Sequence, residues 1–158
     1  MLLGGSDAEN IINLTLKVWS NSIYEERDNE TDKYTRPDGY FVSDFNDALG
    51  NLYSDNTTSK KVSNIKDNQS LVEDIMKKLQ SPPDKLEKCY ETITDLYSAY
   101  QGVTDLAINP TGSYSSYADD KKNKINDFMS AYDKLGTQIP DKIEKDNIKN
   151  GKGDWDER

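Results

Sequence analysis

Apolar side chains recur along this chain at every third or fourth position, a spacing that predicts helices. The first stripe occupies residues 12–23 and predicts a helix that begins at a capping box, Ser6 to Glu9, and ends near Tyr24. The mostly polar residues 25–34 could continue that helix only as an exposed extension. No run alternates between apolar and polar over a useful length, so strands are not expected.

Two further stripes follow in the middle of the chain. A turn at residues 36–39 precedes a short helix on residues 41–52, because Pro presets φ and Gly tolerates positive φ. Residues 54–59 are rich in capping side chains and predict a loop. A longer helix on residues 62–79 then ends at two prolines, and Ser81 is the predicted N-cap of the next helix.

The broadest apolar face belongs to residues 86–103, where two adjacent stripes run side by side. Such a face implies burial against two neighbours, which predicts a central position for this helix. Its predicted end is Asn109, suited to a left-handed cap, followed by Pro110, which cannot continue a helix. A last helix is expected to start at the N-cap Ser113 and to carry its stripe as far as Leu135.

These elements together predict an all-α fold, an antiparallel up-and-down bundle of four to five helices, three long and one or two short. The bundle should be elongated, since a helix of about 25 residues spans roughly 38 Å. Residues 6–140 form the predicted bundle domain. Residues 1–5 are interpreted as a linker or a cloning remnant, and residues 141–158 as a charged, frayed tail.

Composition adds a polar, acidic surface to this picture. The chain has 29 acidic and 20 basic residues, a formal net charge of −9, together with ten Tyr and two Trp that supply buriable area. The acidic balance disfavours nucleic acid as a partner, because binding a polyanion needs clustered Lys and Arg. No apolar run reaches the roughly 18 residues that a transmembrane helix requires.

The sequence lacks the residues that most catalytic and metal-binding sites require. The chain contains no His, so Ser-His-Asp and Cys-His mechanisms lack their base, and a structural zinc site would need more than one Cys. The acid-rich residues 28–39 do not match the spacing of a calcium loop. The sequence predicts no catalytic residue, no cofactor and no metal site. The lone Cys89 lies on an apolar face and is interpreted as a buried structural thiol.

The most distinctive stretch connects the last two predicted helices. It is interpreted first as a helix connection with its stop, turn and cap in order. The alternative is an exposed recognition loop, since Tyr and Ser supply contact area and adaptable hydrogen bonds. The candidate interaction residues of that loop are Asn109, Thr111, Ser113, Tyr114, Ser116 and Tyr117.

Two motifs carry a family resemblance. Val18-Trp19-x-x-x-Ile23-Tyr24 in the first helix, together with Asn109-Pro-x-Gly-Ser-Tyr-x-x-Tyr117, resembles small helical domains of uncharacterised exported or lipid-anchored proteins of low-GC Gram-positive bacteria. The Lys/Asn/Asp-rich, Arg-poor composition is similar. The resemblance implies a place on the outer side of the membrane. No lipid-attachment Cys lies near Met1, so it also implies a tether in a leader upstream.

The function expected from these observations is a non-enzymatic binding or interaction domain of a cell-envelope protein. Its partner would be a protein or a cell-surface component. An alternative is an intracellular acidic regulator, of the immunity or antitoxin type, that neutralises a basic partner by charge complementarity in the cytoplasm. An enzyme that uses paired carboxylates is the third hypothesis.

Overall fold

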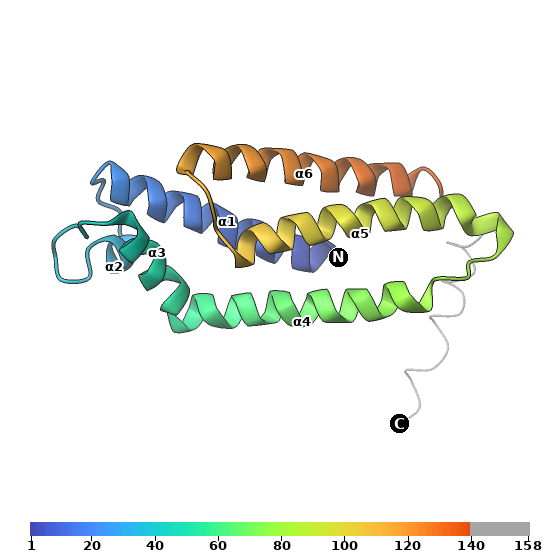
Figure 1. Ribbon diagram of the computed structural model, residues 1–158, viewed down its shortest axis with the longest axis horizontal. Helices are drawn as coiled ribbons and strands as arrows, with labels where there is room; N and C mark the ends of the chain where they lie inside the picture. The colour runs from blue at the N-terminus through green and yellow to red at the C-terminus, as the bar shows by residue number, and fades with distance from the viewer. Residues whose placement is uncertain (140–158) are drawn as a thin grey trace, which may run out of the picture.

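Four long helices dominate the chain in a computed structural model that describes residues 1–139. Successive long helices run in opposite directions, and the molecule is elongated along them (Figure 1). The long helices are α1 (Leu2–Ile23), α4 (Asn56–Lys78), α5 (Glu87–Ile108) and α6 (Tyr114–Gly136), and the short ones are α2 (Asp32–Thr35) and α3 (Phe45–Ser54). The described residues contain no strand. The predicted all-α bundle is confirmed, with four long helices instead of three.

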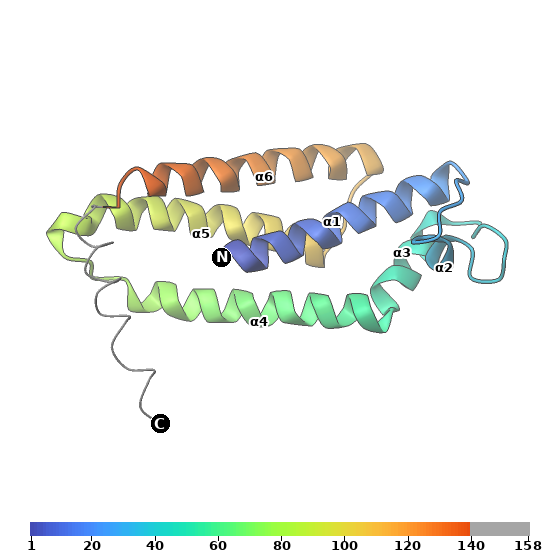
Figure 2. The same ribbon diagram turned by 180° about the vertical axis from the view of Figure 1, so that it is seen from behind.

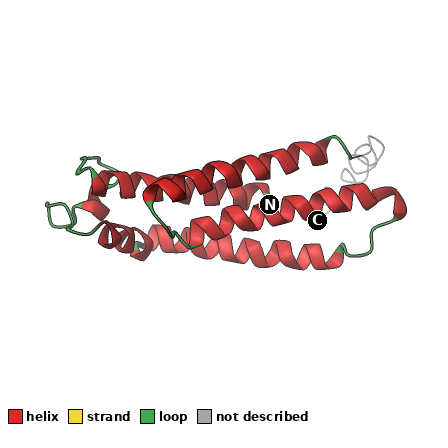
Figure 3. Ribbon diagram, turned by 45° about the horizontal axis from the view of Figure 1, so that its top comes forward, coloured by secondary structure: helices red, strands yellow, loops and turns green. Residues whose placement is uncertain are grey.

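The core lies between α1 and α5, which pack against each other and against both remaining long helices. Within the described residues α4 and α6 make no contact with one another, so they flank this central pair (Figure 3). Most of the largest fully buried aliphatic and aromatic side chains come from this centre, among them Ile11, Ile12, Tyr100 and Val103. The central position predicted for residues 86–103 is therefore confirmed.

The prediction that residues 1–5 form a linker is wrong. Helix α1 begins at Leu2, and both Gly4 and Gly5 are buried inside the bundle. A Cβ on Gly4 would overlap Asn68 Oδ1 and lie 2.8 Å from Tyr100 Oη, so only glycine lets α1 approach α4 and α5 this closely. The predicted capping box at Ser6 is not formed, because Ser6 lies inside a helix that has already started.

Residues 25–34 do not continue the first helix, which their sequence left open as an exposed extension. Helix α1 ends at Ile23, and Glu25 adopts a left-handed φ of 53°, which reverses the chain. The chain then returns along α1 and forms the short helix α2, where Tyr34 and Thr35 are buried. The segment is thus folded against the bundle instead of extending into solvent.

The connections before and after α4 both differ from those that the sequence predicts. Residues 54–59 are not a loop, because Asp55 alone separates α3 from α4 and serves as the N-cap of α4. Its carboxylate accepts hydrogen bonds from Thr57 N at 3.0 Å and Thr58 N at 3.2 Å. Ser81 is not a helix cap either. A 3₁₀ turn at Asp84–Leu86 precedes α5, which begins at Glu87.

The sequence makes two predictions for the connection after α5, one for the end of α5 and one for the start of α6. The first is wrong and the second is confirmed. Asn109 has φ −127° and ψ 78°, so it ends α5 without the predicted left-handed conformation. Ser113 is the N-cap of α6, as predicted, and the structure adds a capping box with Ser116. The tail predicted at residues 141–158, including Trp155, lies outside the described residues.

Several stripe residues remain exposed because α1 covers only part of the bundle's length. Its N-terminus lies about midway along the other long helices, beside the residues that Gly4 approaches (Figure 2). Beyond that point α1 no longer covers α4 and α6, and of the long helices in the described chain only α5 packs against them. Their exposed apolar side chains include Leu71, Ile75, Leu79, Met129 and Tyr132.

The stability of the core depends on pH through the hydroxyl group of Tyr100. Its hydroxyl donates to Asn68 Oδ1 at 2.6 Å, and burial raises the pKa of Tyr100 to about 12 from the ordinary 10.0. Between these two values the unfolded chain has lost a proton that the folded chain retains. The stabilisation is therefore complete below pH 10 and is lost as the pH rises towards 12.

We expect the free energy of unfolding to fall with rising pH over that window, measured by urea unfolding at a series of alkaline pH values. Tyr100→Phe should be less stable at neutral pH and show a shallower alkaline fall. Tyr24→Phe, at an exposed position, controls for the substitution itself. Equal slopes for Tyr100→Phe and the parent protein would contradict the assignment.

Candidate functional site

The α5–α6 connection is the candidate site that the sequence singles out, and most of it is accessible. Asn109, Thr111, Ser113 and Ser116 are exposed, and Tyr114 is half-buried against the core. These five residues remain available for contact with a partner.

Tyr117 does not belong to this surface. Its side chain is fully buried, and its hydroxyl donates to the carbonyl of Leu106 at 3.0 Å. Burial raises the pKa of Tyr117 far above its ordinary value. Tyr117 is a core residue because it lies one turn inside α6, on the face that contacts Leu106 of α5 and Trp19 of α1.

An aromatic stack joins this connection to the α2–α3 region. The Trp19 ring lies 5.8 Å from Phe45 and 5.7 Å from Tyr117, between ring centroids. The start of α3, the last part of α1 and the start of α6 are therefore packed together. The connection lies towards the same end of the bundle as α2 and α3 (Figure 1). We call residues 24–45 and 109–116 the loop end.

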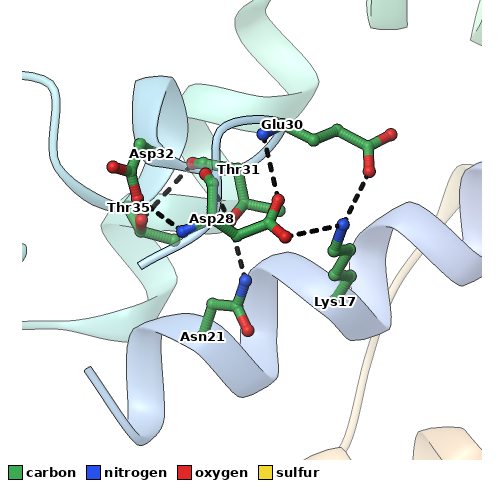
Figure 4. Close-up of polar contacts among 7 residues, drawn as sticks. All are labelled: Lys17, Asn21, Asp28, Glu30, Thr31, Asp32 and Thr35. Atoms are coloured by element: carbon green, nitrogen blue, oxygen red, sulfur yellow. Dashed lines mark hydrogen bonds and ion pairs between the residues drawn. The ribbon is translucent and has the colours of Figure 1, made fainter. Parts of the chain in front are cut away.

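A polar cluster holds the first part of the loop end onto α1 (Figure 4). Lys17 Nζ forms ion pairs with Asp28 Oδ2 at 3.0 Å and Glu30 Oε2 at 2.8 Å. Deeper in the same cluster Asn21 Nδ2 donates to Thr31 Oγ1 at 2.8 Å, and both residues are buried. The returning chain is thus tied to α1 at two levels, one buried and one at the surface.

The carboxylates of this cluster are already engaged within the loop. Asp28 Oδ1 accepts from Glu30 N at 2.9 Å, and Asp32 accepts from Asp28 N at 3.0 Å and pairs with Arg36 at 3.1 Å. The hydrogen bond from Lys17 holds the pKa of Asp28 below its ordinary value. Across residues 1–139 no group of three or more His, Cys, Asp or Glu side chains is placed to hold a metal ion. The ion pairs with Lys17 hold the loop on α1, and the remaining contacts of the two aspartates lie within the loop.

The sequence alone does not predict this tie, because the polar composition of residues 25–34 favours solvent exposure. A local signal was present. Asp28 and Asp32 are short acidic side chains at the start of a turn and of a helix, where such residues accept backbone N–H bonds. The contact with Asn21 and Lys17 has no comparable signal, because it depends on where the chain returns.

The loop end exposes aromatic side chains on this fixed segment. Tyr40 is 84% exposed, Tyr24 is 64% exposed, and Phe45 is 38% exposed beside its contact with Trp19. Between them Arg36 lies over the Phe41 ring, 5.1 Å from its centroid, and donates to the carbonyl of Gly39. Exposed aromatic area is therefore presented on a backbone held by several polar contacts.

A concave surface runs along the seam between α5 and α6. It consists of two hollows of ≈ 390 Å³ each, which share Gly102 and Lys124. The hollow nearer the loop end includes two of the candidate residues, Asn109 and Thr111. We call the two hollows together the α5–α6 groove.

Cys89 is a buried thiol, as predicted. Its Sγ donates to the carbonyl of Gln138 at 3.1 Å, and Thr92 Oγ1 donates to the side chain of the same residue at 2.7 Å. These contacts fasten the end of the described chain to the start of α5. They give the thiol a packing role.

In comparisons with known proteins, no family model, no curated protein and no solved structure matches this chain. Among residues 1–139, none of the helices has the length and hydropathy that a membrane span requires. What the protein does has to be inferred from its own residues and their geometry.

Proposed function

We propose that this protein is a non-catalytic binding module that contacts a protein or cell-surface partner with its loop end. The observation that carries the proposal is the exposure of Tyr24 and Tyr40 on a segment tied to α1 through Lys17 and Asn21. Aromatic side chains dominate binding energy at interfaces, and a pre-organised backbone loses little entropy on binding. The exposed polar residues of the α5–α6 connection would supply adaptable hydrogen bonds at the same end.

The two-motif resemblance supports a place for this module on the outer side of a Gram-positive cell envelope, with a lipid tether upstream. Trp19 and Tyr24, which carry the first motif, lie in the loop end or directly beneath it. The second motif is the α5–α6 connection. Both motifs therefore meet at one end of the bundle, which suits a shared contact surface.

An intracellular acidic regulator is the second candidate. The net charge of −9 and the carboxylates along the α5–α6 groove favour it, since a basic partner would be attracted to both. An enzyme with paired carboxylates has less support. The carboxyl groups of Asp28 and Asp55 have pKa values held below the ordinary range, by Lys17 and by the backbone amide of Thr58, whereas a general acid needs a raised pKa.

The loop-end proposal predicts that Tyr24→Ser with Tyr40→Ser weakens partner binding at least tenfold while the melting temperature is unchanged. The matched control is Leu71→Ser with Tyr132→Ser, which removes two exposed side chains from the other half of the bundle. Binding is measured with labelled protein on intact Gram-positive cells and on their soluble extract.

The outcomes separate the candidates. Loss of binding in the loop-end variant alone supports the proposal. Equal binding by the loop-end variant and the parent protein overturns it. Binding only in the soluble extract, abolished by moderate salt, favours the acidic regulator, since exposed charge pairs are screened by ions.

A further inference from the structure

The α5–α6 groove has a floor of small side chains. Ser98, Ala99 and Gly102 line it from α5, and Ser130 and Ala131 line it from α6. Over Gly102 the floor is crossed by the Lys124 side chain, whose Nζ would lie 3.4 Å from a Cβ at that position. The other floor residues carry small side chains that reach little beyond the two backbones. A third helix needs a separation of about 8–10 Å between axes to pack well, and small residues allow the short end of that range.

The walls of the groove are mainly acidic. Asp95, Asp127, Asp105 and Asp120 line its two hollows, and Lys124 is the cation between them. Asp95 is paired with Lys134 at 3.1 Å. Within the described residues Asp105, Asp120 and Asp127 form no ion pair, and Lys124 forms none with them. Asp105 Oδ1 does accept a hydrogen bond from Gln69 Nε2 of α4 at 2.9 Å, but this partner is neutral. The groove thus presents three carboxylates without an ion pair against one lysine.

The carboxylates come from both helices and follow the groove along its length. On α6, Asp120 and Asp127 lie two turns apart on either side of Lys124, and on α5 Asp105 follows Asp95 at ten residues. A helix laid in the groove would pass each of them in turn. Basic side chains at every third or fourth position of such a helix would reach the walls, while its small or apolar residues face the floor.

From this arrangement we infer that the α5–α6 groove is a docking site for a basic amphipathic helix of a partner protein, with Lys or Arg beside the groove carboxylates. Charge complementarity selects the occupant, and the small-residue floor sets how closely its backbone approaches. The groove shares only Asn109 and Thr111 with the loop end, and its proposed role does not depend on the function proposed for that end.

The test uses an alanine-based helical peptide with lysines along one face, titrated into the isotope-labelled full chain and followed by amide chemical shifts. The groove variant replaces three carboxylates by their isosteric amides: Asp105→Asn, Asp120→Asn and Asp127→Asn. The matched control makes the same charge change at exposed acids elsewhere: Asp38→Asn, Asp47→Asn and Asp67→Asn. A third variant, Ser98→Phe, fills the floor without changing any charge.

We expect the peptide to shift the amides of groove residues and to bind the groove variant about tenfold more weakly than the control variant. Ser98→Phe should also bind more weakly while keeping the parent's melting temperature. Equal weakening of groove and control variants would show a general attraction to an acidic protein and would overturn the site. So would shifts located outside the groove, or equal binding of a proline-containing peptide with the same lysines that cannot form a helix.

Discussion

Leu96→Asp is expected to abolish the cooperative fold. Leu96 lies on α5, the helix that packs against all three other long helices, and its side chain is 5% exposed. The substitution removes about 2 kcal/mol of apolar burial and leaves a carboxylate without a partner in the core. An unpaired buried charge costs several kcal/mol more, against a total stability of about 5–15 kcal/mol for a domain of this kind.

Circular dichroism during thermal unfolding measures this effect. The matched control is Thr94→Asp, which introduces the same charge two residues away at an exposed position of α5. The control should keep the parent's helicity and a sharp transition, because its carboxylate stays in water. A sharp transition and full helicity in Leu96→Asp would mean that the core assigned to α5 is wrong.

Gly4→Leu should produce the second-largest loss, about 2–3 kcal/mol, because overpacking in a closely packed core forces its neighbours to move. A Cβ at this position would overlap Asn68 Oδ1 and lie 2.8 Å from Tyr100 Oη. These two atoms form a hydrogen bond of 2.6 Å, and Tyr100 is fully buried, so neither can move freely. The larger side chain must displace the start of α1 or break that bond.

Urea unfolding is the appropriate measurement, with a lower midpoint and an unchanged slope as the expected result. Leu3→Ser is the control, because Leu3 is the neighbouring residue and is 83% exposed. It tests whether any change in the first turn of α1 matters. If Gly4→Leu unfolds at the parent's midpoint, the first turn of α1 does not pack between α4 and α5 in solution.

The helices were predictable because their signals are local. The stripe that contains Leu96 repeats within α5 itself, and the N-cap Ser113 directly precedes the helix that it caps. Predictions failed where the deciding contact came from another part of the chain. Residues 1–5 have a linker's composition, yet Gly4 and Gly5 serve as close-packing positions against α4, α5 and α6.

The candidate site shows the same division. The α5–α6 connection could be located from its stop, turn and cap, but the burial of Tyr117 follows from where α6 lies on α5 and α1. The tie of Asp28 and Glu30 to Lys17 joins residues more than ten positions apart, and the exposed tyrosines become a fixed surface only through that tie.

The sequence by itself determined the helical class, the apolar face of each long helix and the acidic surface, because periodicity, capping and charge depend on residues within a few turns. The tertiary structure decided which faces meet: Gly4 with Asn68 and Tyr100, Trp19 with Phe45 and Tyr117, and the two walls of the α5–α6 groove. These contacts between helices depend on how whole helices pack. Because the apolar stripes of the long helices are similar, many pairings of helices would satisfy the same hydrophobic periodicity.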